Sequence, residues 1–231
     1  MTETGQGKDA TVDAEALYKL VKRQLENFWE IETDNREFMI EMIHKALEKL
    51  NRSFSVSKNK YYQKNGFSPY NSVQYSVFLY YLSNLAGKAM GGGKIADQIY
   101  YLNKIMNGVD WYWAIELPEH FLAEHPVGTV LGRAEYGDYF CVYQGVTVGG
   151  NWKQGEIYYP KIGNHVTCYA NTSIIGRCEI GDYVVISANS FLKDVQIPDG
   201  SLVFGSSPRL VVKNYGKSRI WGYFSECWEV E

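Results

Sequence analysis

Between residues 130 and 192, an apolar residue recurs at nearly every sixth position of the chain. These residues are Val130, Tyr136, Val142, Val148, Ile162, Cys168, Ile174, Ile180, Ile186 and Leu192. A small or β-branched residue follows most of them four positions later, with Phe140 as the large exception: Ala134, Val146, Val166, Thr172, Cys178, Val184 and Ser190. A six-residue period fits neither an α-helix nor a β-hairpin. It is typical of a parallel β-helix, a prism with three short strands in each coil of about eighteen residues.

The repeat is interrupted once. The step from Val148 to Ile162 is not a multiple of six, unlike the steps before and after it. We therefore predict a loop, Gly149 to Pro160, that protrudes from one side of the prism.

Upstream of the repeat, the apolar spacing predicts helices. Asp13 is a candidate cap for a first helix, and Thr33 or Asp34 for a second. Their expected inward residues are Leu17, Leu20, Val21, Leu25 and Phe28 in the first helix, and Phe38, Ile40, Met42, Ile43, Ala46, Leu47 and Leu50 in the second. A polar connector from Asn51 to Gly66 precedes two more helices, at about 71–89 and 94–106, each ending at glycine. Residues 109–117 are predicted to form the first strands, which end at Pro118.

This order predicts an α+β protein with three parts. Residues 1–108 form an all-α N-terminal domain whose first ten or so residues are disordered, residues 109–213 form the β-helix prism, and residues 214–231 form a tail. The tail is rich in aromatic residues, which we expect to pack on the prism or on a neighbouring subunit: Trp221, Tyr223, Phe224 and Trp228.

Charge and composition exclude several classes of partner. The net charge of −3, without a cluster of Lys and Arg, argues against nucleic acid and anionic membranes. Residues 1–9 lack the apolar core of a signal peptide, and the longest apolar stretch, 73–89, is too polar to span a bilayer. The four cysteines show no paired spacing, so we expect reduced thiols and a cytoplasmic protein.

Three motifs add a specific resemblance: His125-Pro126-Val127-Gly128, the segment Gln144-Gly145-Val146-Thr147-Val148-Gly149-Gly150, and Pro160-Lys161-Ile162. With the six-residue repeat, they resemble the hexapeptide-repeat acyltransferases. The order of helices, prism and mid-coil loop is similar to that of bacterial serine O-acetyltransferases. The resemblance covers about residues 115–212 and is weak over the helices. It implies that the prism is a left-handed parallel β-helix.

The resemblance also implies a chemistry, the direct transfer of an acetyl group from acetyl-CoA to an acceptor hydroxyl. His125 would be the general base, a task suited to an imidazole that titrates near neutrality. A carboxylate should orient the ring, and Glu116 is the first candidate because its segment resembles the family's strand with that acid. Asp110, fifteen residues before His125, fits stacking in adjacent coils better and is the second candidate. Glu124 would line the acceptor pocket.

Coenzyme A in this family lies in a groove between two subunits, where small residues let the backbone approach it. The resemblance assigns such contacts to Gly150, Ala170 and Ala188, and the two alanines are eighteen residues apart, one coil above the other. Gly149 or Gly150 would supply the oxyanion donor. The implied assembly is a homotrimer, or a dimer of trimers joined by the helical domains. No metal is expected.

Two departures bear on the acceptor. The family carries an Arg-His pair before Pro-Lys-Ile, where this chain has Tyr158 and Tyr159, which cannot form an ion pair with an amino-acid carboxylate. The chain also ends in Val230-Glu231 and not in the apolar terminus that binds the family's sulfhydrylase partner. A sugar hydroxyl stacked on the tyrosines is therefore an alternative to serine.

Two other classes of function remain as hypotheses. A metal hydratase on the same prism would use His120 and His125, whose spacing resembles that of prism-type carbonic anhydrases. It also needs a third ligand about two coils earlier, and no histidine lies between His44 and His120. A non-catalytic scaffold is the other hypothesis, and a failure to bind acetyl-CoA would support it.

Overall fold

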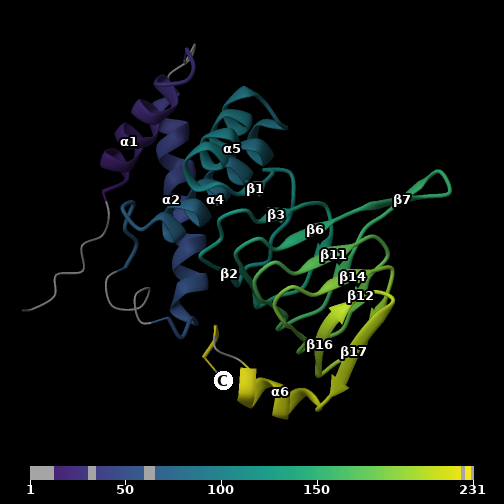
Figure 1. Ribbon diagram of the computed structural model, residues 1–231. Helices are drawn as coiled ribbons and strands as arrows, with labels where there is room; N and C mark the ends of the chain where they lie inside the picture. Colours follow the sequence, from purple (N-terminus) through teal and green to yellow (C-terminus); the bar gives the residue numbers. More distant parts are fainter. Residues whose placement is uncertain (1–12, 31–34, 60–65, 225–226, 230–231) are drawn as a thin grey trace, which may run out of the picture.

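The computed structural model describes residues 13–30, 35–59, 66–224 and 227–229. Helices stand at one end of the molecule, and a β-helix extends away from them (Figure 1). The helices are α1 (Ala14–Glu26), α2 (Arg36–Ser55), α4 (Ser72–Met90) and α5 (Lys94–Asn107). Buried apolar residues of the helices and of the coils form one continuous cluster, so the two parts share a core. No helix in the described ranges combines the length and hydropathy that crossing a bilayer requires.

The helix boundaries follow local capping chemistry. The Asp13 carboxylate accepts from the N–H of Glu15 at the start of α1, as predicted, and Asn71 caps α4. The predicted cap of the second helix, Thr33 or Asp34, is wrong, because Asn35 caps α2 and its side-chain oxygen accepts from the N–H of Phe38. The ends of α4 and α5 are left-handed glycines, as the sequence predicts.

Two further details of the helix prediction are wrong. Helix α2 continues to Ser55 instead of giving way to a connector at Asn51, because Ser53 is buried. Its hydroxyl donates to the carbonyl of Phe121 (2.6 Å) and accepts from the N–H of Phe121 (3.1 Å), which ties α2 to the prism. Phe28 lies beyond the end of α1 and is 52% exposed instead of facing the core.

The predicted parallel β-helix is confirmed, with about five coils. One face contains β1 (Asp110–Trp111), β3 (Val130–Leu131), β6 (Thr147–Gly149), β11 (Ser173–Ile175) and β14 (Phe191–Lys193). The second contains β2 (Phe121–Glu124), β5 (Phe140–Tyr143), β10 (Thr167–Cys168), β13 (Val185–Ile186) and β16 (Ser201–Ser206). The third contains β4 (Glu135–Tyr136), β9 (Lys161–Ile162), β12 (Glu179–Ile180) and β15 (Gln196–Ile197). Strand β17 (Arg209–Asn214) pairs antiparallel with β16 and closes the far end.

The interior matches the six-residue repeat with one shift. From Val142 to Leu192 the predicted inward residues are at most 4% exposed. The prediction that Val130 faces the core is wrong. Val130 is 39% exposed, and Leu131, which pairs with Val148, faces the core instead. The first strand prediction was also too long. Only Asp110 and Trp111 form a strand within residues 109–117.

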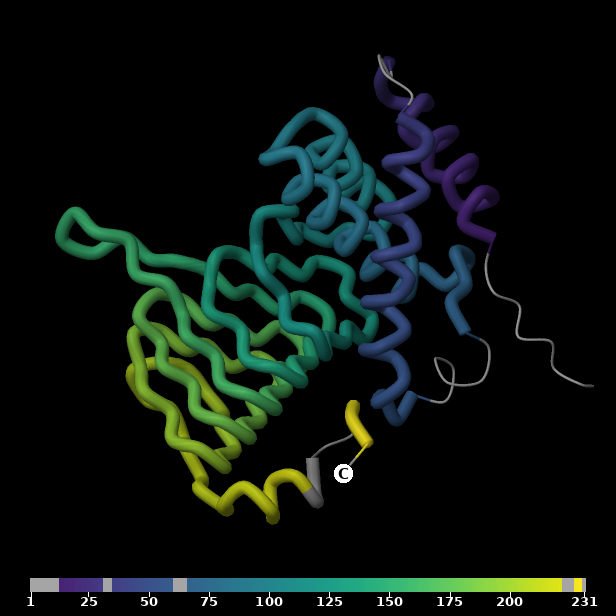
Figure 2. The backbone as a smooth tube through the Cα atoms, turned by 180° about the vertical axis from the view of Figure 1, so that it is seen from behind, coloured from purple at the N-terminus to yellow at the C-terminus, as the bar shows by residue number. Residues whose placement is uncertain are grey.

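The interruption of the repeat is a β-hairpin of β7 (Asn151–Lys153) and β8 (Glu156–Tyr158). After the hairpin, Ser173 pairs with Phe191 across one regular coil of eighteen residues. The coil that contains the hairpin, from Thr147 to its partner Ser173, is longer by eight residues. The hairpin projects from the side of the prism in both views (Figures 1 and 2). This confirms the predicted protrusion between Gly149 and Pro160.

Each coil turns three corners, and residues at one corner stack in columns. We call the turns after β2, β5, β10 and β13 the His125 corner, and those after β3, β6, β11 and β14 the hairpin corner. The turns before β2, β5, β10 and β13 form the aromatic corner. Non-glycine residues adopt a positive φ at all three corners, as His125, Asn171, Tyr139 and Asp194 do. The positive φ of His125 is therefore a property of the coil.

The C-terminal segment folds back along the prism toward the end of α2 (Figures 1 and 2). Helix α6 (Lys217–Phe224) carries Trp221, which packs on the prism, as Trp228 does. This confirms the predicted role of Trp221 and Trp228, while the side chains of Tyr223 and Phe224 lie outside the described residues. The expectation that all cysteines are reduced is wrong, because Cys141 and Cys227 form a disulfide. The two lie 86 residues apart and meet only because the tail returns to the second coil. Cys168 and Cys178 are buried free thiols.

The register at the start of the repeat is testable. We expect Leu131→Ala to lower the free energy of unfolding by about 2–5 kcal/mol, because it leaves a cavity in the prism. Val130→Ala should cost less than about 1 kcal/mol. Denaturant unfolding of both variants measures the difference. Equal losses would contradict the register.

Candidate functional site

His125 lies at the end of β2, at a corner that is longer than its neighbour. Glu124 pairs with Tyr143, and Val130 pairs with Thr147, so the same turn takes six positions after Glu124 but only four after Tyr143. The turn after β2 thus holds two residues more than the turn after β5. His125 is exposed there, and its imidazole has no hydrogen-bond or ion-pair partner in the part of the chain that the structure describes.

Glu124, directly before His125, is half-buried and has a defined partner. The Nδ2 of Asn59, from the segment after α2, donates to Oε1 of Glu124 at 3.0 Å. The sequence predicted a site role for Glu124 but none for Asn59. Nothing in the polar run around Asn59 distinguishes it, since the contact joins positions 65 residues apart.

Ala170 and Ala188 stack at the same corner, as their eighteen-residue spacing requires. The N–H of Asn189 donates to the carbonyl of Ala170 (2.8 Å), and the amide of Asn171 bonds that of Asn189 (3.2 Å). Toward His125, the same register places Gln144 and then Val127 in this column, because the N–H of Asn171 donates to the carbonyl of Gln144 and the N–H of Gly145 donates to that of Val127.

The two acids proposed for His125 have different surroundings. Glu116 is 63% exposed and forms an ion pair with Lys88 of α4. Asp110 lies on β1, and its N–H donates to the carbonyl of Thr129, within the His125 corner (2.8 Å). Lys104 and Tyr100 each donate to one oxygen of Asp110, both at 2.6 Å. Burial raises the pKa of Asp110, but these two hydrogen bonds outweigh it and hold the pKa below its usual range.

Gly150, Tyr158 and Tyr159 lie elsewhere, at the base of the hairpin. A Cβ on Gly150 would stand 2.8 Å from the ring of Tyr159, so the packing of the hairpin itself requires glycine there. Gly149 precedes it at the end of β6. The hydroxyl of Tyr158 donates to Glu156 (2.8 Å), and this contact raises the pKa of Tyr158.

Two arginines stack on these tyrosines. The guanidinium of Arg133 lies 5.4 Å from the ring centre of Tyr159, and that of Arg177 lies 5.8 Å from the ring centre of Tyr158. They come from the coils on either side of the hairpin. Both are exposed and form no ion pair within the described residues. Lys153, by contrast, is paired with Asp194 (3.6 Å).

The structure therefore sorts the predicted site residues into two groups. His125, Glu124, Ala170 and Ala188 share the His125 corner, and Asp110 adjoins it. Gly150, Tyr158 and Tyr159 occupy the hairpin corner, at the opposite end of β6 and its neighbouring strands. Within one chain these groups do not meet.

His120 lies away from His125, at the aromatic corner. The two histidines flank the four-residue strand β2, so their Cα atoms are about 16 Å apart at 3.3 Å per residue. One ion cannot bind both within a chain. Of the side chains described, no three His, Cys, Asp or Glu are grouped to hold a metal ion.

The aromatic corner holds a ladder that the sequence analysis missed. The rings of His120, Tyr139, His165 and Tyr183 stack with 4.4 Å between successive centroids. Beside them, the Oδ1 atoms of Asp138, Asn164, Asp182 and Asp199 each accept the N–H of the coil before, at 2.8–2.9 Å. The signal in the sequence was the motif of glycine, Asp or Asn, and an aromatic residue at 137–139, 163–165 and 181–183.

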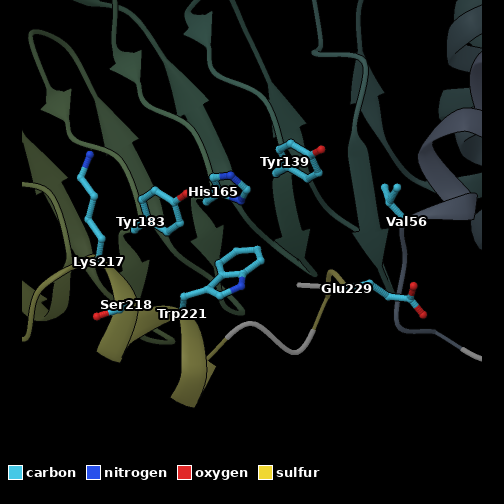
Figure 3. Close-up of a pocket in the computed structure, with 8 residues that line it drawn as sticks. All are labelled: Val56, Tyr139, His165, Tyr183, Lys217, Ser218, Trp221 and Glu229. Atoms are coloured by element: carbon cyan, nitrogen blue, oxygen red, sulfur yellow. The ribbon is translucent and has the colours of Figure 1, made fainter. Parts of the chain in front are cut away.

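The ladder also lines a pocket of about 520 Å³ between the prism and the C-terminal tail (Figure 3). Trp221 stands edge-to-face against His165 on one side, and Val56 and Glu229 lie at the other end. Lys217 lies over Tyr183 and bonds Asp182 and Asp199, and these contacts raise its pKa. The pocket is separate from the His125 corner, and none of the predicted site residues lines it.

Comparison with known proteins places the chain in a family. The family described as bacterial transferase hexapeptide (six repeats) matches residues 159–194. A serine acetyltransferase of Synechococcus elongatus is 34% identical over 116 residues, which are 49% of this chain and 47% of the relative. A serine acetyltransferase of Helicobacter pylori is 30% identical over 121 residues, 52% of this chain and 70% of the relative. The match thus spans about half of the first relative and over two thirds of the second.

Solved structures share the fold. A serine acetyltransferase from Neisseria gonorrhoeae superposes with a TM-score of 0.65 at 22% identity, over 90% of this chain and 82% of that one. A serine acetyltransferase solved as a complex with CoA gives a TM-score of 0.56 at 18% identity, over 84% and 75%. At these identities the likeness concerns the fold. The Helicobacter pylori relative, 30% identical over 70% of its length, shows that the chain belongs to the serine acetyltransferase family of hexapeptide-repeat proteins.

Proposed function

We propose that the protein is an acetyl-CoA-dependent O-acetyltransferase in which His125 is the general base. The observation that carries this proposal is the His125 corner itself. It exposes an unpaired imidazole on a lengthened turn and places Glu124 beside it, and Ala170 and Ala188 lie at the same corner in later coils. Family membership supports the same reaction.

In the proposed step, Nε2 or Nδ1 of His125 accepts the proton of the acceptor hydroxyl while that oxygen attacks the thioester carbonyl. A tetrahedral oxyanion forms, the C–S bond breaks, and the imidazolium returns its proton to the leaving CoA thiolate. The N–H of Gly149 or Gly150 is the proposed oxyanion donor. Glu124 is the proposed acceptor-binding carboxylate.

Asp110 is the better candidate for the acid that supports His125. Its strand is hydrogen-bonded directly to the His125 corner, and its lowered pKa keeps it ionised, as stabilisation of an imidazolium requires. Both acids form an ion pair with a lysine, Asp110 with Lys104 and Glu116 with Lys88, so position distinguishes them. Glu116, the first candidate from sequence, belongs to the loop between β1 and β2.

Coenzyme A is proposed to lie along Ala170 and Ala188. The column of alanines there has no side chain beyond Cβ, so the chain's residues fit an extended pantetheine arm. Gly150 lies on the hairpin corner and would contact the coenzyme from a second chain.

We further propose that the active unit is a homotrimer with sites between subunits. The support is the separation of the predicted site residues into two corners, which one chain cannot join and two adjacent prisms can. A dimer of trimers through the helical domains is the larger assembly that this arrangement allows.

A sugar or polyol hydroxyl is the second candidate acceptor beside serine. The observation that favours it is the pair of tyrosines at the hairpin base, whose rings can stack on a sugar. Arg133 and Arg177, which lie on those rings, are the cations available to a carboxylate. The choice between serine and a sugar as acceptor therefore depends on whether these guanidinium groups stay stacked on the tyrosines or bind the carboxylate of the substrate.

We expect His125→Ala to lower turnover by about 10²- to 10⁴-fold with little change in acetyl-CoA affinity, because proton removal is lost and coenzyme contacts are kept. Release of free CoA thiol from acetyl-CoA measures turnover, and calorimetry measures affinity. Unchanged turnover would remove His125 from the mechanism.

The same assay shows which acid supports His125. Asp110→Asn should lower kcat at least tenfold, and Glu116→Gln should stay within about twofold of the unmodified protein.

Sedimentation velocity should give a trimer or a multiple of it. Mixing His125→Ala chains with Tyr158→Ala/Tyr159→Ala chains should restore part of the activity that each variant lacks alone, because a shared site takes one corner from each chain. An active monomer would contradict the proposal.

L-serine should be a weak acceptor compared with the best member of a panel of sugars and polyols. Tyr158 and Tyr159 cannot form an ion pair with the carboxylate of L-serine. The loss of one charged hydrogen bond costs roughly 1.5–3 kcal/mol, which lowers affinity by about ten- to a hundredfold. Steady-state kinetics with both acceptors measures the ratio. A sub-millimolar KM for L-serine would defeat this expectation, and Arg133→Ala would then test which cation holds its carboxylate.

A further inference from the structure

The C-terminal tail forms a small junction with the segment that follows α2. The N–H of Lys58 donates to the carbonyl of Cys227 (3.0 Å), and the N–H of Glu229 donates to the carbonyl of Val56 (2.8 Å). Ser57 and Trp228 face each other in an antiparallel bridge between these bonds. Figure 3 shows Val56 and Glu229 close together at this end of the pocket. Residues 56–58 and 227–229 are thus one unit, which we call the tail junction.

The tail junction is fixed to the second coil by two contacts. Cys227 is bonded to Cys141 of β5, and both are buried. Trp228 stands edge-to-face against Tyr139 (5.4 Å) on the aromatic ladder. Because Val142 faces the core, Cys141 points to the outer side of the second face, as strand alternation requires.

Asn59 connects the tail junction to Glu124. Its backbone N–H donates to the hydroxyl of Ser57 (3.1 Å), and its Nδ2 donates to Oε1 of Glu124 (3.0 Å). Glu124 pairs with Tyr143, only two residues after Cys141 on β5. The disulfide and the Glu124 carboxylate therefore lie on the same outer face, about 7 Å apart along the strands.

We propose that Asn59 is a positioning residue that fixes the Glu124 carboxylate beside His125, and that the Cys141–Cys227 disulfide holds Asn59 in place. The inference rests on the proposed function, in which Glu124 binds the acceptor. It makes acceptor binding, but not coenzyme binding, sensitive to the redox state of a bond outside the site.

The redox step is a thiol–disulfide exchange with a dithiol. The two thiols of the dithiol reduce the Cys141–Cys227 bond through a mixed disulfide and leave as an intramolecular disulfide. Two electrons and two protons end on the Cys141 and Cys227 sulfurs. The tail junction then loses its covalent tie to β5 and retains only the tryptophan contacts and backbone hydrogen bonds.

The first experiment compares substitutions at residue 59, using the best acceptor from the panel of L-serine, sugars and polyols. Asn59→Ala should raise the acceptor KM about tenfold, because the carboxylate loses a hydrogen bond, and leave the KM for acetyl-CoA within twofold. Asn59→Gln keeps an amide donor and should recover most of the loss. A general structural role for Asn59 would move both KM values together, and equal acceptor KM values in all three proteins would overturn the proposal.

The second experiment changes the redox state of the whole protein. Thiol labelling of the denatured, unreduced protein should find two free cysteines, whereas four would overturn the proposal. Dithiothreitol should raise the acceptor KM several-fold in the unmodified protein. The Cys141→Ser/Cys227→Ser double variant should already have the raised KM and should not respond to dithiothreitol. An equal response in both proteins would overturn the inference.

Hydrogen exchange gives a readout that does not depend on activity. On reduction, peptides covering residues 56–59 and 121–127 should exchange faster in the unmodified protein, while peptides from the distant coil 173–193 should not change. Absence of faster exchange overturns the inference. Absence of turnover with every acceptor, with faster exchange present, instead refutes the proposed function and leaves the structural coupling standing.

Discussion

The parallel pairing of each coil with the next is the constraint on which this structure depends. Backbone hydrogen bonds between coils hold equivalent residues one above another at the strand spacing of about 4.8 Å. Side chains at equivalent positions of successive coils therefore form columns, and these columns determine which chemical groups each side of the prism presents. The interior column is apolar, the aromatic corner stacks rings beside Asp and Asn oxygens, and the His125 corner continues into alanines.

The candidate site lies where the regular spacing is broken. After the hairpin, paired residues are eighteen apart between β11 and β14 and seventeen apart between β13 and β16. The turn at His125 is longer than the next turn by two residues, and the hairpin adds eight more to the third coil. Both insertions push side chains out of the columns. Because they lie at different corners, the proposed site would need two chains, and assembly and catalysis would then depend on the same departures from the repeat.

The tail and the helices meet at the other end of this arrangement. Ser53 ties α2 to β2, and Cys227 ties the tail to β5, so the segment between them is held from both sides. The carboxylate of Glu124 lies at this meeting point. Elements that are distant in the sequence thus converge on the proposed acceptor-binding residue, whereas the residues proposed to bind the coenzyme belong to the coils alone.

The sequence by itself determined the β-helix, the place of the inserted hairpin, the cap of α1 and the glycines that end α4 and α5. These depend on local spacing, which short-range backbone geometry converts directly into structure. Only the tertiary structure decided that Leu131 and not Val130 faces the core, that Lys88 engages Glu116, and that Cys141 meets Cys227. It also joined Asn59 to Glu124. Each of these contacts connects residues through the stacking of coils or the return of the tail, and spacing along the chain contains no record of which distant segments come together.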